Sequence, residues 1–272
     1  INPGSDAANY EISQIAAMRR DYKNALTYAR RAAALDNGNP WYMMHIANIY
    51  IEESKLDSAG IWLEKAIELD PGNENEKFRL GNLYLQTGNA GDAEKIFTGF
   101  YEKYGAGEQI ISLLINAKIK LGKYDEAEKI LIDEIGSAGG NDAMEAMLAE
   151  LYREKGDSEK AGSLYEKLMK EGGDYTPLRF SYMEFLMENG DYGTLVKNVE
   201  KIREKGNVPV EDEIGMWMWL IQDTALINDY GSQLGVIAED LWNENKDEPA
   251  VMMTMTEIYA ALGEKEKELE QA

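Results

Sequence analysis

Residues able to perform chemistry are scarce in this chain of 272 residues. His45 is the only histidine and no cysteine is present, so a histidine-dependent nucleophile would have to use His45, and thiolate chemistry is absent. No phosphate loop, dinucleotide-binding glycine pattern or calcium-loop spacing occurs. Carboxylates are so numerous that no catalytic pair stands out. The sequence therefore predicts no enzyme activity, no cofactor and no metal, with His45 in a structural or groove-lining role.

Amide side chains, by contrast, recur at a fixed spacing. Asn48, Asn82 and Asn116 follow one another at a spacing of 34 (82 − 48 = 116 − 82 = 34), and Gln14 stands at the same spacing before Asn48. An amide offers both a donor and an acceptor, so such a row could hold the backbone of an extended peptide. The alternative is that these asparagines bond helix ends or neighbouring repeats. Later members of the row are Glu150, Glu184, Gln222 and Glu257.

A second row, of large apolar side chains, lies four residues before the first, one helical turn away. It contains Tyr10, Met44 and Phe78, and Trp41 and Trp219 fall on the same side of their expected helices. Aromatic side chains and methionine are enriched at protein interfaces. We expect an apolar binding surface beside the amides. The alternative, packing against an adjacent helix, is the one that we favour for Met44.

A regular repeat with this same spacing must position both rows. Ala59 and Ala93 are equivalent (93 − 59 = 34), and small residues at a constant phase indicate close helix crossings. Glycines at a constant phase indicate helix C-termini that need a left-handed residue. The small-residue positions are Ala25, Ala59, Ala93, Ala127, Ala161 and Leu195, and the turn positions are Arg20, Ser54, Gly88, Gly122, Gly156 and Gly190. Two helices joined by a tight turn, repeated along the chain, are therefore predicted.

The best-formed repeat carries Ile46-Ala47, Tyr50, Ala59, Leu63, Ala66 and Pro71. The next carries Leu80-Gly81, Tyr84, Gly88, Ala93 and Phe97. These residues resemble the tetratricopeptide repeat, whose unit is a helix–turn–helix of about 34 residues. The resemblance covers essentially the whole chain. It implies an all-α, alpha-alpha superhelix, a right-handed solenoid of about seven and a half to eight repeats whose first helices line a concave groove.

The phase of the repeat divides the chain into eight expected units. Small-residue loops, including Gly139-Gly140, Gly172-Gly173 and Gly206-Asn207, separate some of them. The start, Ile1 to Gly4, matches the repeat-closing stretch Leu69 to Gly72, so we expect a single array that is a fragment of a longer protein. The units span residues 6–37, 40–71, 74–104, 108–136, 141–172, 175–206, 210–245 and, in part, 249–272.

The seventh unit departs from the period. Asp191-Tyr192-Gly193-Thr194 recurs as Asp229-Tyr230-Gly231-Ser232 at a spacing of 38 (229 − 191 = 38) instead of 34. This match predicts a lengthened loop or first helix over Val210–Asn228 and a second helix around Gly231–Asn243.

The resemblance also allows the residues that bind one known ligand of the family to be compared with this sequence. The family's clamp for the carboxylate tails of heat-shock chaperones needs Lys, Asn, Asn, Lys and Arg over three repeats. The matching positions carry Tyr10, Gln14, His45, Asn75 and Arg79, of which only Arg79 fits. One unit later they carry Met44, Asn48, Arg79, Gln109 and Leu113, of which only Asn48 fits. Chaperone-tail binding is therefore not expected, and Arg79 remains a groove candidate.

The net charge of the chain limits the classes of molecule that it is expected to bind. Its 50 acidic and 28 basic residues give a formal net charge of −22, which lacks the basic footprint of nucleic-acid binding. No apolar run approaches the ~20 residues of a membrane span. We expect a soluble protein, cytoplasmic or in the bacterial periplasm or cell envelope, whose partner is neutral or basic.

Two functions follow as hypotheses. The first is a non-catalytic protein–protein interaction scaffold that binds a peptide or partner segment in its concave groove. The alternative is a structural spacer or self-association module, a possible homodimer, within a larger multidomain protein and without a groove ligand. The groove residues of the first hypothesis are Asn48, Asn82, Asn116, Tyr10, Trp41, Met44, Phe78, Arg79 and Trp219.

Overall fold

The computed structural model describes residues 4–138, 142–171, 176–205 and 208–264. These ranges contain fifteen helices and no strand, so the predicted all-α class is confirmed. The chain forms two compact units, residues 1–147 and 148–272, and the boundary between them falls inside α9 (Asp142–Lys155).

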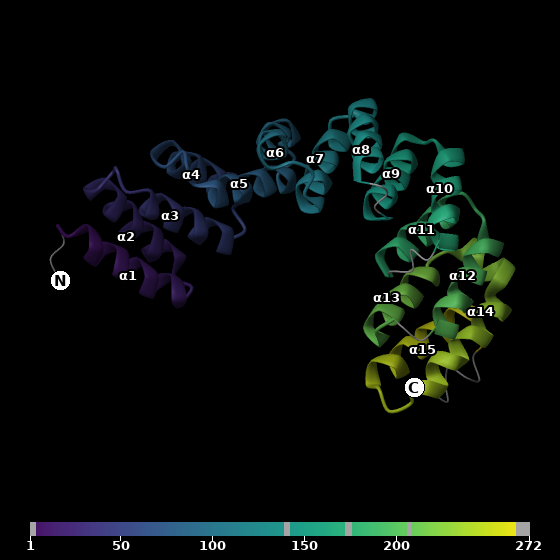
Figure 1. Cartoon of the computed structure of the whole chain (residues 1–272). Helices are drawn as coiled ribbons and strands as arrows, with labels where there is room; N and C mark the ends of the chain where they lie inside the picture. The colour runs from purple at the N-terminus through teal and green to yellow at the C-terminus, as the bar shows by residue number, and fades with distance from the viewer. Residues whose placement is uncertain (1–3, 139–141, 172–175, 206–207, 265–272) are drawn as a thin grey trace. The chain divides into compact units, whose positions relative to one another are not determined.

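In unit 1 the helices pack in chain order, as the purple to teal part of Figure 1 shows. Helices α1 and α2, α3 and α4, and α5 and α6 form helix–turn–helix pairs, and each pair packs on the next through α2 with α3, α4 with α5, and α6 with α7. The helices are α1 (Asp6–Met18), α2 (Tyr22–Leu35), α3 (Pro40–Glu52), α4 (Leu56–Leu69), α5 (Glu74–Gln86), α6 (Ala90–Tyr104), α7 (Glu108–Lys120) and α8 (Tyr124–Ala138).

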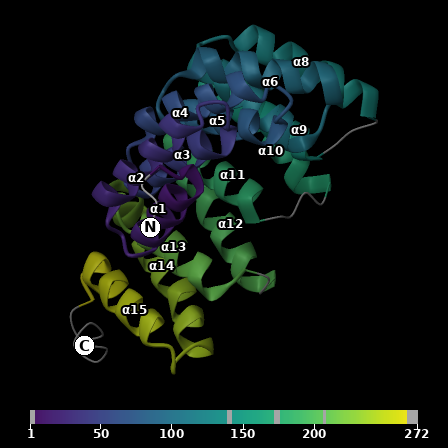
Figure 2. The same cartoon turned by 90° about the vertical axis from the view of Figure 1, so that its left-hand side faces the viewer.

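In unit 2, helices that are two apart in chain order also pack against each other. Helix α12 packs against α14, and α15 packs against both α13 and α14; Figure 2 draws α14 beside α15. The helices are α10 (Ser158–Glu171), α11 (Thr176–Glu188), α12 (Tyr192–Lys205), α13 (Val210–Leu220), α14 (Thr224–Glu244) and α15 (Pro249–Leu262).

The turns inside the helix pairs adopt the left-handed backbone that the glycine phase predicts. Gly88, Gly122 and Gly156 have φ of 81°, 69° and 81°. At the equivalent turns Arg20 and Ser54 also have positive φ, 59° and 58°, although a Cβ makes this conformation costly. The backbone geometry of the turn is therefore kept even where glycine is missing.

The residues at the small-residue positions of the repeat lie in the core. Ala25, Ala59, Ala93, Ala127 and Ala161 are each 0% exposed, as expected for close helix crossings. Among the described glycines of unit 1, Gly81 of α5 has the tightest surroundings, since an added Cβ would lie 2.7 Å from Cζ of Phe97 on α6. Because that atom belongs to a fully buried ring, a larger residue at this position would separate the two helices.

The expected helix boundaries in the seventh unit are wrong. Helix α13 ends at Leu220, and α14 begins at Thr224 and runs for 21 residues. The turn lies at residues 221–223 and ends at Asp223. Asp223 accepts a hydrogen bond from the backbone N of Leu226 at 2.8 Å as the N-cap of α14. Asp223 follows Asp191 at a spacing of 32 (223 − 191 = 32), whereas the repeated Asp229 motif lies inside α14. Gly231 is buried there, and a Cβ on it would meet Leu262 at 3.1 Å.

Three expected loops, at Gly139-Gly140, Gly172-Gly173 and Gly206-Asn207, lie outside the described residues. A left-handed residue also ends α15, where Gly263 has φ of 74°. The division of the whole chain into one array of eight units, its handedness and its place in a longer protein stay predictions.

Candidate protein-binding surface

The amide row occupies the first helices of unit 1, but its members have different environments. Asn48 on α3 is exposed, and its Oδ1 accepts a hydrogen bond from Nη2 of Arg79 on α5 at 2.6 Å. Asn82 donates from Nδ2 to the carbonyl of Phe78, one turn back in its own helix, at 3.0 Å. Asn116 on α7 is exposed. The row is thus partly engaged within the protein.

Arg79 links two of the first helices. Its Nη1 donates to both carboxylate oxygens of Glu76, at 2.9 and 2.7 Å, while Nη2 reaches Asn48. A guanidinium held from two sides loses less conformational freedom when a ligand binds. Arg79 therefore orients the carbonyl end of the Asn48 amide and leaves its NH₂ group as the donor.

The apolar row divides into core and surface residues. Met44 is 6% exposed and belongs to the core of unit 1, so it offers little surface for contact. Phe78 is half-buried, edge-on to Phe97 and Phe100 at ring-centroid distances of 5.6 Å each. Trp41, in contrast, is 68% exposed. Of the aromatic candidates in unit 1, Trp41 presents the largest accessible surface.

Trp219 belongs to the other unit. It is half-buried on α13, next to Trp217 and Leu220, which are both fully buried. Its predicted role in binding stays a prediction, and it is considered separately from the unit 1 residues.

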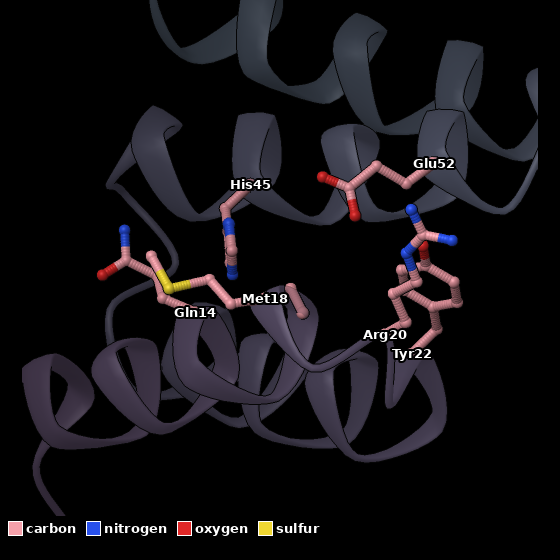
Figure 3. A pocket seen from close by; sticks show the side chains of 7 residues that line it. Gln14, Met18, Arg20, Tyr22, His45 and Glu52 are labelled. Carbon is pink, nitrogen blue, oxygen red and sulfur yellow. The ribbon is translucent and has the colours of Figure 1, made fainter.

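A furrow runs between α1 and α3 in unit 1, and we call it the α1–α3 furrow. Its wider part has a volume of about 600 Å³. A second part of about 370 Å³ lies toward the starts of the two helices, and Gln14 lines both. Figure 3 shows the wider part, with His45 and Glu52 projecting from α3 toward side chains of α1 and the α1–α2 turn. The labelled lining residues are Gln14, Met18, Arg20, Tyr22, His45 and Glu52.

His45 has a structural role at the floor of this furrow. Ser13 is 0% exposed, and its hydroxyl donates to the carbonyl of Ala25 at 2.7 Å. With its one proton used, the hydroxyl must accept from Nε2–H of His45, 2.8 Å away. Burial lowers the pKa of His45, so the neutral imidazole is favoured, with Nδ1 left as an acceptor. Ser13 is inaccessible and already bonded, which excludes a nucleophilic serine–histidine pair here.

In unit 2 the first two members of the same row, Glu150 and Glu184, are carboxylates held by an arginine. Arg153 on α9 has a side chain 14% exposed, and its Nη1 donates to Glu184 at 3.1 Å and to Glu188 at 3.2 Å on α11. Its Nη2 bonds Glu150 on its own helix, and Glu150 also accepts from the Tyr165 hydroxyl at 2.8 Å. The acidic part of the row is therefore partly neutralised by the chain itself.

Several functional and structural residues were missed from the sequence. Met18 is 84% exposed in the furrow. It stands at the end of a helix, but its position in the repeat carries no signal of a binding role. Lys118 is buried and bonds Glu94 and Glu126 at 2.8 and 2.7 Å; its place at an otherwise apolar phase was the available signal. In the described residues, no group of three or more His, Cys, Asp or Glu could hold a metal ion.

Comparisons with known proteins also point to helical repeats. Residues 52–134 match the family model of anaphase-promoting complex, cyclosome, subunit 3, and residues 143–174 match that of the tetratricopeptide repeat. No match was found among curated protein sequences. Helix–turn–helix units in series define a helical repeat protein. The matched segments and the fold are those of tetratricopeptide repeats.

Solved structures with a similar fold have low sequence identity. YrrB, described as a tetratricopeptide repeat protein with an unusual peptide-binding site, is 16% identical with a TM-score of 0.50, over 66% of this chain and 93% of that one. A tetratricopeptide repeat protein from Parabacteroides merdae is 20% identical (TM-score 0.49, 74% and 78% covered). MamA from Desulfovibrio magneticus is 16% identical (TM-score 0.48, 63% and 97% covered). In the described residues no helix is both long and apolar enough to cross a bilayer.

Proposed function

We propose that this protein is a non-catalytic interaction scaffold that binds a segment of a partner protein along the α1–α3 furrow. The observation that carries the proposal is the furrow itself, bordered by two large exposed side chains, Trp41 and Met18. Large apolar side chains that stay accessible on a folded surface mark interaction sites when they border a concave surface.

The polar rows extend this surface beyond the furrow. Asn48, Arg79, Asn82 and Asn116 lie on the successive first helices α3, α5 and α7. The free NH₂ group of Asn48 and the amide of Asn116 can bond the backbone of an extended segment without regard to its side chains. Phe78 adds a half-buried aromatic surface. The amide of Asn82, with one donor already bonded within α5, has its carbonyl left to accept.

Random peptides displayed on phage, selected against the whole chain, test the proposal. Peptides that bind should lose most of their affinity when Met18 is replaced by Lys, since a charge placed in the furrow would oppose apolar contact. Ile61→Lys is the matched control, because Ile61 is 52% exposed on α4 and lines no part of the furrow. Calorimetric titration of each variant gives the affinities.

Selection of peptides that bind both variants equally would refute the furrow as the binding site. The spacer or self-association hypothesis is examined with the same protein by light scattering at several concentrations. A molar mass that rises with concentration, together with no furrow-dependent peptide, would favour that alternative.

A further inference from the structure

The narrower part of the furrow combines aromatic rings with negative charge. Its lining includes Tyr10, Trp41 and Tyr42 as rings, Glu11 as a carboxylate, and the amides of Gln14 and Asn39. No lysine, arginine or histidine is among its lining residues. We call this part the Trp41 cleft. An aromatic face next to a carboxylate is an arrangement that attracts a cation.

Two of the three rings of the cleft, Tyr10 and Tyr42, are fixed before any ligand arrives. Tyr10 lies between Tyr42 and His45, with ring centroids 5.4 and 4.8 Å away. Tyr42 is in turn fixed by a hydrogen bond of 2.8 Å from its hydroxyl to Oδ2 of Asp6. This bond brings a second carboxylate behind the cleft. Little side-chain freedom remains to be lost on binding at Tyr10, which favours affinity.

Several aromatic residues outside the cleft carry one of the chain's own cations over the ring, including the exposed Tyr104, whose ring centroid lies 5.0 Å from Nζ of Lys103. Nζ of Lys65 lies 4.1 Å from the ring centroid of Trp62, three residues earlier on α4. Nζ of Lys160 lies 4.7 Å from the centroid of Tyr152 in unit 2. The residue three positions after Trp41 is Met44, which is buried. In the described part of the chain, no cation is placed over Trp41.

The helix starts near the cleft oppose the binding of a cation. The N-terminal ends of α1 and α3 carry partial positive charge, and Trp41 lies in the first turn of α3. The side chain of Asn39 accepts from the Trp41 backbone N at 3.1 Å, so one of the exposed N–H groups is satisfied. The full charges of Glu11 and Asp6 outweigh the remaining partial charge, and the local field favours a cation.

We propose that the Trp41 cleft takes a lysine or arginine side chain of the bound partner segment. The cation would lie on the Trp41 face, with its alkyl stem along Tyr10 and its charge toward Glu11. This inference rests on the proposed function, since it assigns one subsite within the furrow. It names the chemistry of the partner: a polypeptide with a basic residue at a fixed position.

The test uses peptides selected on phage against the whole chain and then synthesised in pairs. In one member of each pair a lysine is replaced by norleucine, which keeps most of the alkyl stem and removes the charge. We expect the lysine peptide to bind about tenfold more tightly to the unmodified chain. With Trp41→Leu or Glu11→Gln that difference should shrink to about twofold or less. Trp62→Leu is the matched control, because Lys65 already covers that ring.

The outcomes separate the two proposals. Peptides whose affinity depends on Met18 but not on their lysine or on Trp41 would overturn the cation subsite and leave furrow binding intact. Peptides that bind without any dependence on the furrow would overturn both. Thermal melts monitored by circular dichroism check that each variant is folded; Trp41, being 68% exposed, is replaceable with little loss of packing.

Discussion

The first helices of the two units carry different chemistry at the same repeat position. In unit 1 that position holds Asn48 and Asn82, and in unit 2 it holds Glu150 and Glu184. Each unit uses one arginine to link neighbouring first helices across this row. Arg79 bonds a single amide and Glu76, whereas Arg153 lies among several glutamates. The repeat thus fixes where a side chain stands, and its type decides whether it is available to a ligand.

The charge of each unit follows this difference. Residues 1–147 contain 23 acidic and 15 basic residues, a net charge of −8, and residues 148–272 contain 27 and 13, a net charge of −14. Unit 2 uses part of its basic side chains internally, as in the buried pair of Arg203 with Glu213. Unit 1 keeps exposed amides and an exposed Trp41 on its first helices. The proposed binding surface therefore lies in the less acidic unit, where the row is not closed by internal ion pairs.

The largest effect is expected from removing the arginine of unit 2. Arg153→Met leaves several carboxylates close together without their cation, and the arginine side chain is only 14% exposed. We expect a loss of about 3 kcal/mol in the free energy of unfolding. Arg79→Met, the matched change in unit 1, should cost about 1 kcal/mol or less, since Arg79 is 39% exposed. Urea unfolding followed by tryptophan fluorescence measures both. Equal losses would contradict the distinction between the two rows.

Alkaline pH should weaken both units through buried tyrosines. Burial, followed by the hydrogen bond to Asp6, raises the pKa of Tyr42 to about 12. In unit 2, burial raises the pKa of Tyr182 to about 12. Because the folded chain holds these protons more tightly than the unfolded chain, the stability contribution is complete below pH 10. It is lost as the pH rises from about 10 to 12.

The matched variants are Tyr42→Phe and Tyr182→Phe, and melting temperature as a function of pH is the measurement. In each variant the melting temperature should fall less above pH 10 than it does in the unmodified chain. At pH 7 Tyr42→Phe should also cost about 1 kcal/mol, because it removes the hydrogen bond to Asp6. An unchanged alkaline profile in both variants would show that other groups control the loss.

Much of the fold could be predicted because it depends on backbone requirements. Small residues such as Ala59 and Ala93 are needed wherever two helices cross closely, and a left-handed residue is needed at each turn. These requirements recur with the period and are visible in the sequence. The prediction for the seventh unit is wrong because the four-residue similarity of Asp229-Tyr230-Gly231-Ser232 to an earlier turn indicates a turn where α14 is continuous. The competing signal, an N-cap at Asp223, is short and common.

The site was less predictable because it depends on side-chain contacts. The amide row was correctly placed on the first helices, yet the bond of Asn82 to its own helix depends on a rotamer that spacing does not reveal. Met44 is core, as favoured from the sequence, but its phase does not reveal that Tyr10 and Phe78 at the same phase are only half-buried. The furrow needs the positions of residues on α1 and α3 together, and no periodic pattern contains it.

The turns offer a smaller comparison between the units. In unit 1 Ser54 has φ of 58°, while the equivalent Gly156 and Gly190 in unit 2 have 81° and 68°. Ser54→Gly should raise the free energy of unfolding by about 1 kcal/mol, because the strain of a Cβ at positive φ is removed. Gly156→Ser should lower it by a similar amount. Denaturant unfolding measures both changes. A decrease for Ser54→Gly together with an increase for Gly156→Ser would mean that chain entropy, which disfavours glycine, outweighs the strain.

The smallest stability effect is expected from making unit 1 resemble unit 2. Asn48→Glu places a carboxylate where Arg79 already donates, at 2.6 Å, to an oxygen, so the new charge gains a partner at an exposed site. We expect the free energy of unfolding to change by no more than about 0.5 kcal/mol. Glu150→Gln in unit 2 should cost more, about 1 to 2 kcal/mol, because both Arg153 and Tyr165 lose a charged acceptor.

The informative result of Asn48→Glu is in binding rather than in stability. The variant replaces the NH₂ donor of Asn48 with an acceptor, so a peptide carbonyl that bonded the amide is left without a partner. We expect calorimetric titration to give an affinity weaker by about tenfold for peptides that bind the furrow and extend over α3. Asn82→Asp is the matched control, because the NH₂ group of Asn82 already donates within α5 and is less available to a ligand. An equal loss of affinity for Asn82→Asp and Asn48→Glu would contradict this distinction. It would mean that the amide of Asn82 binds the peptide despite its hydrogen bond within α5, and that all amides of the row contribute alike.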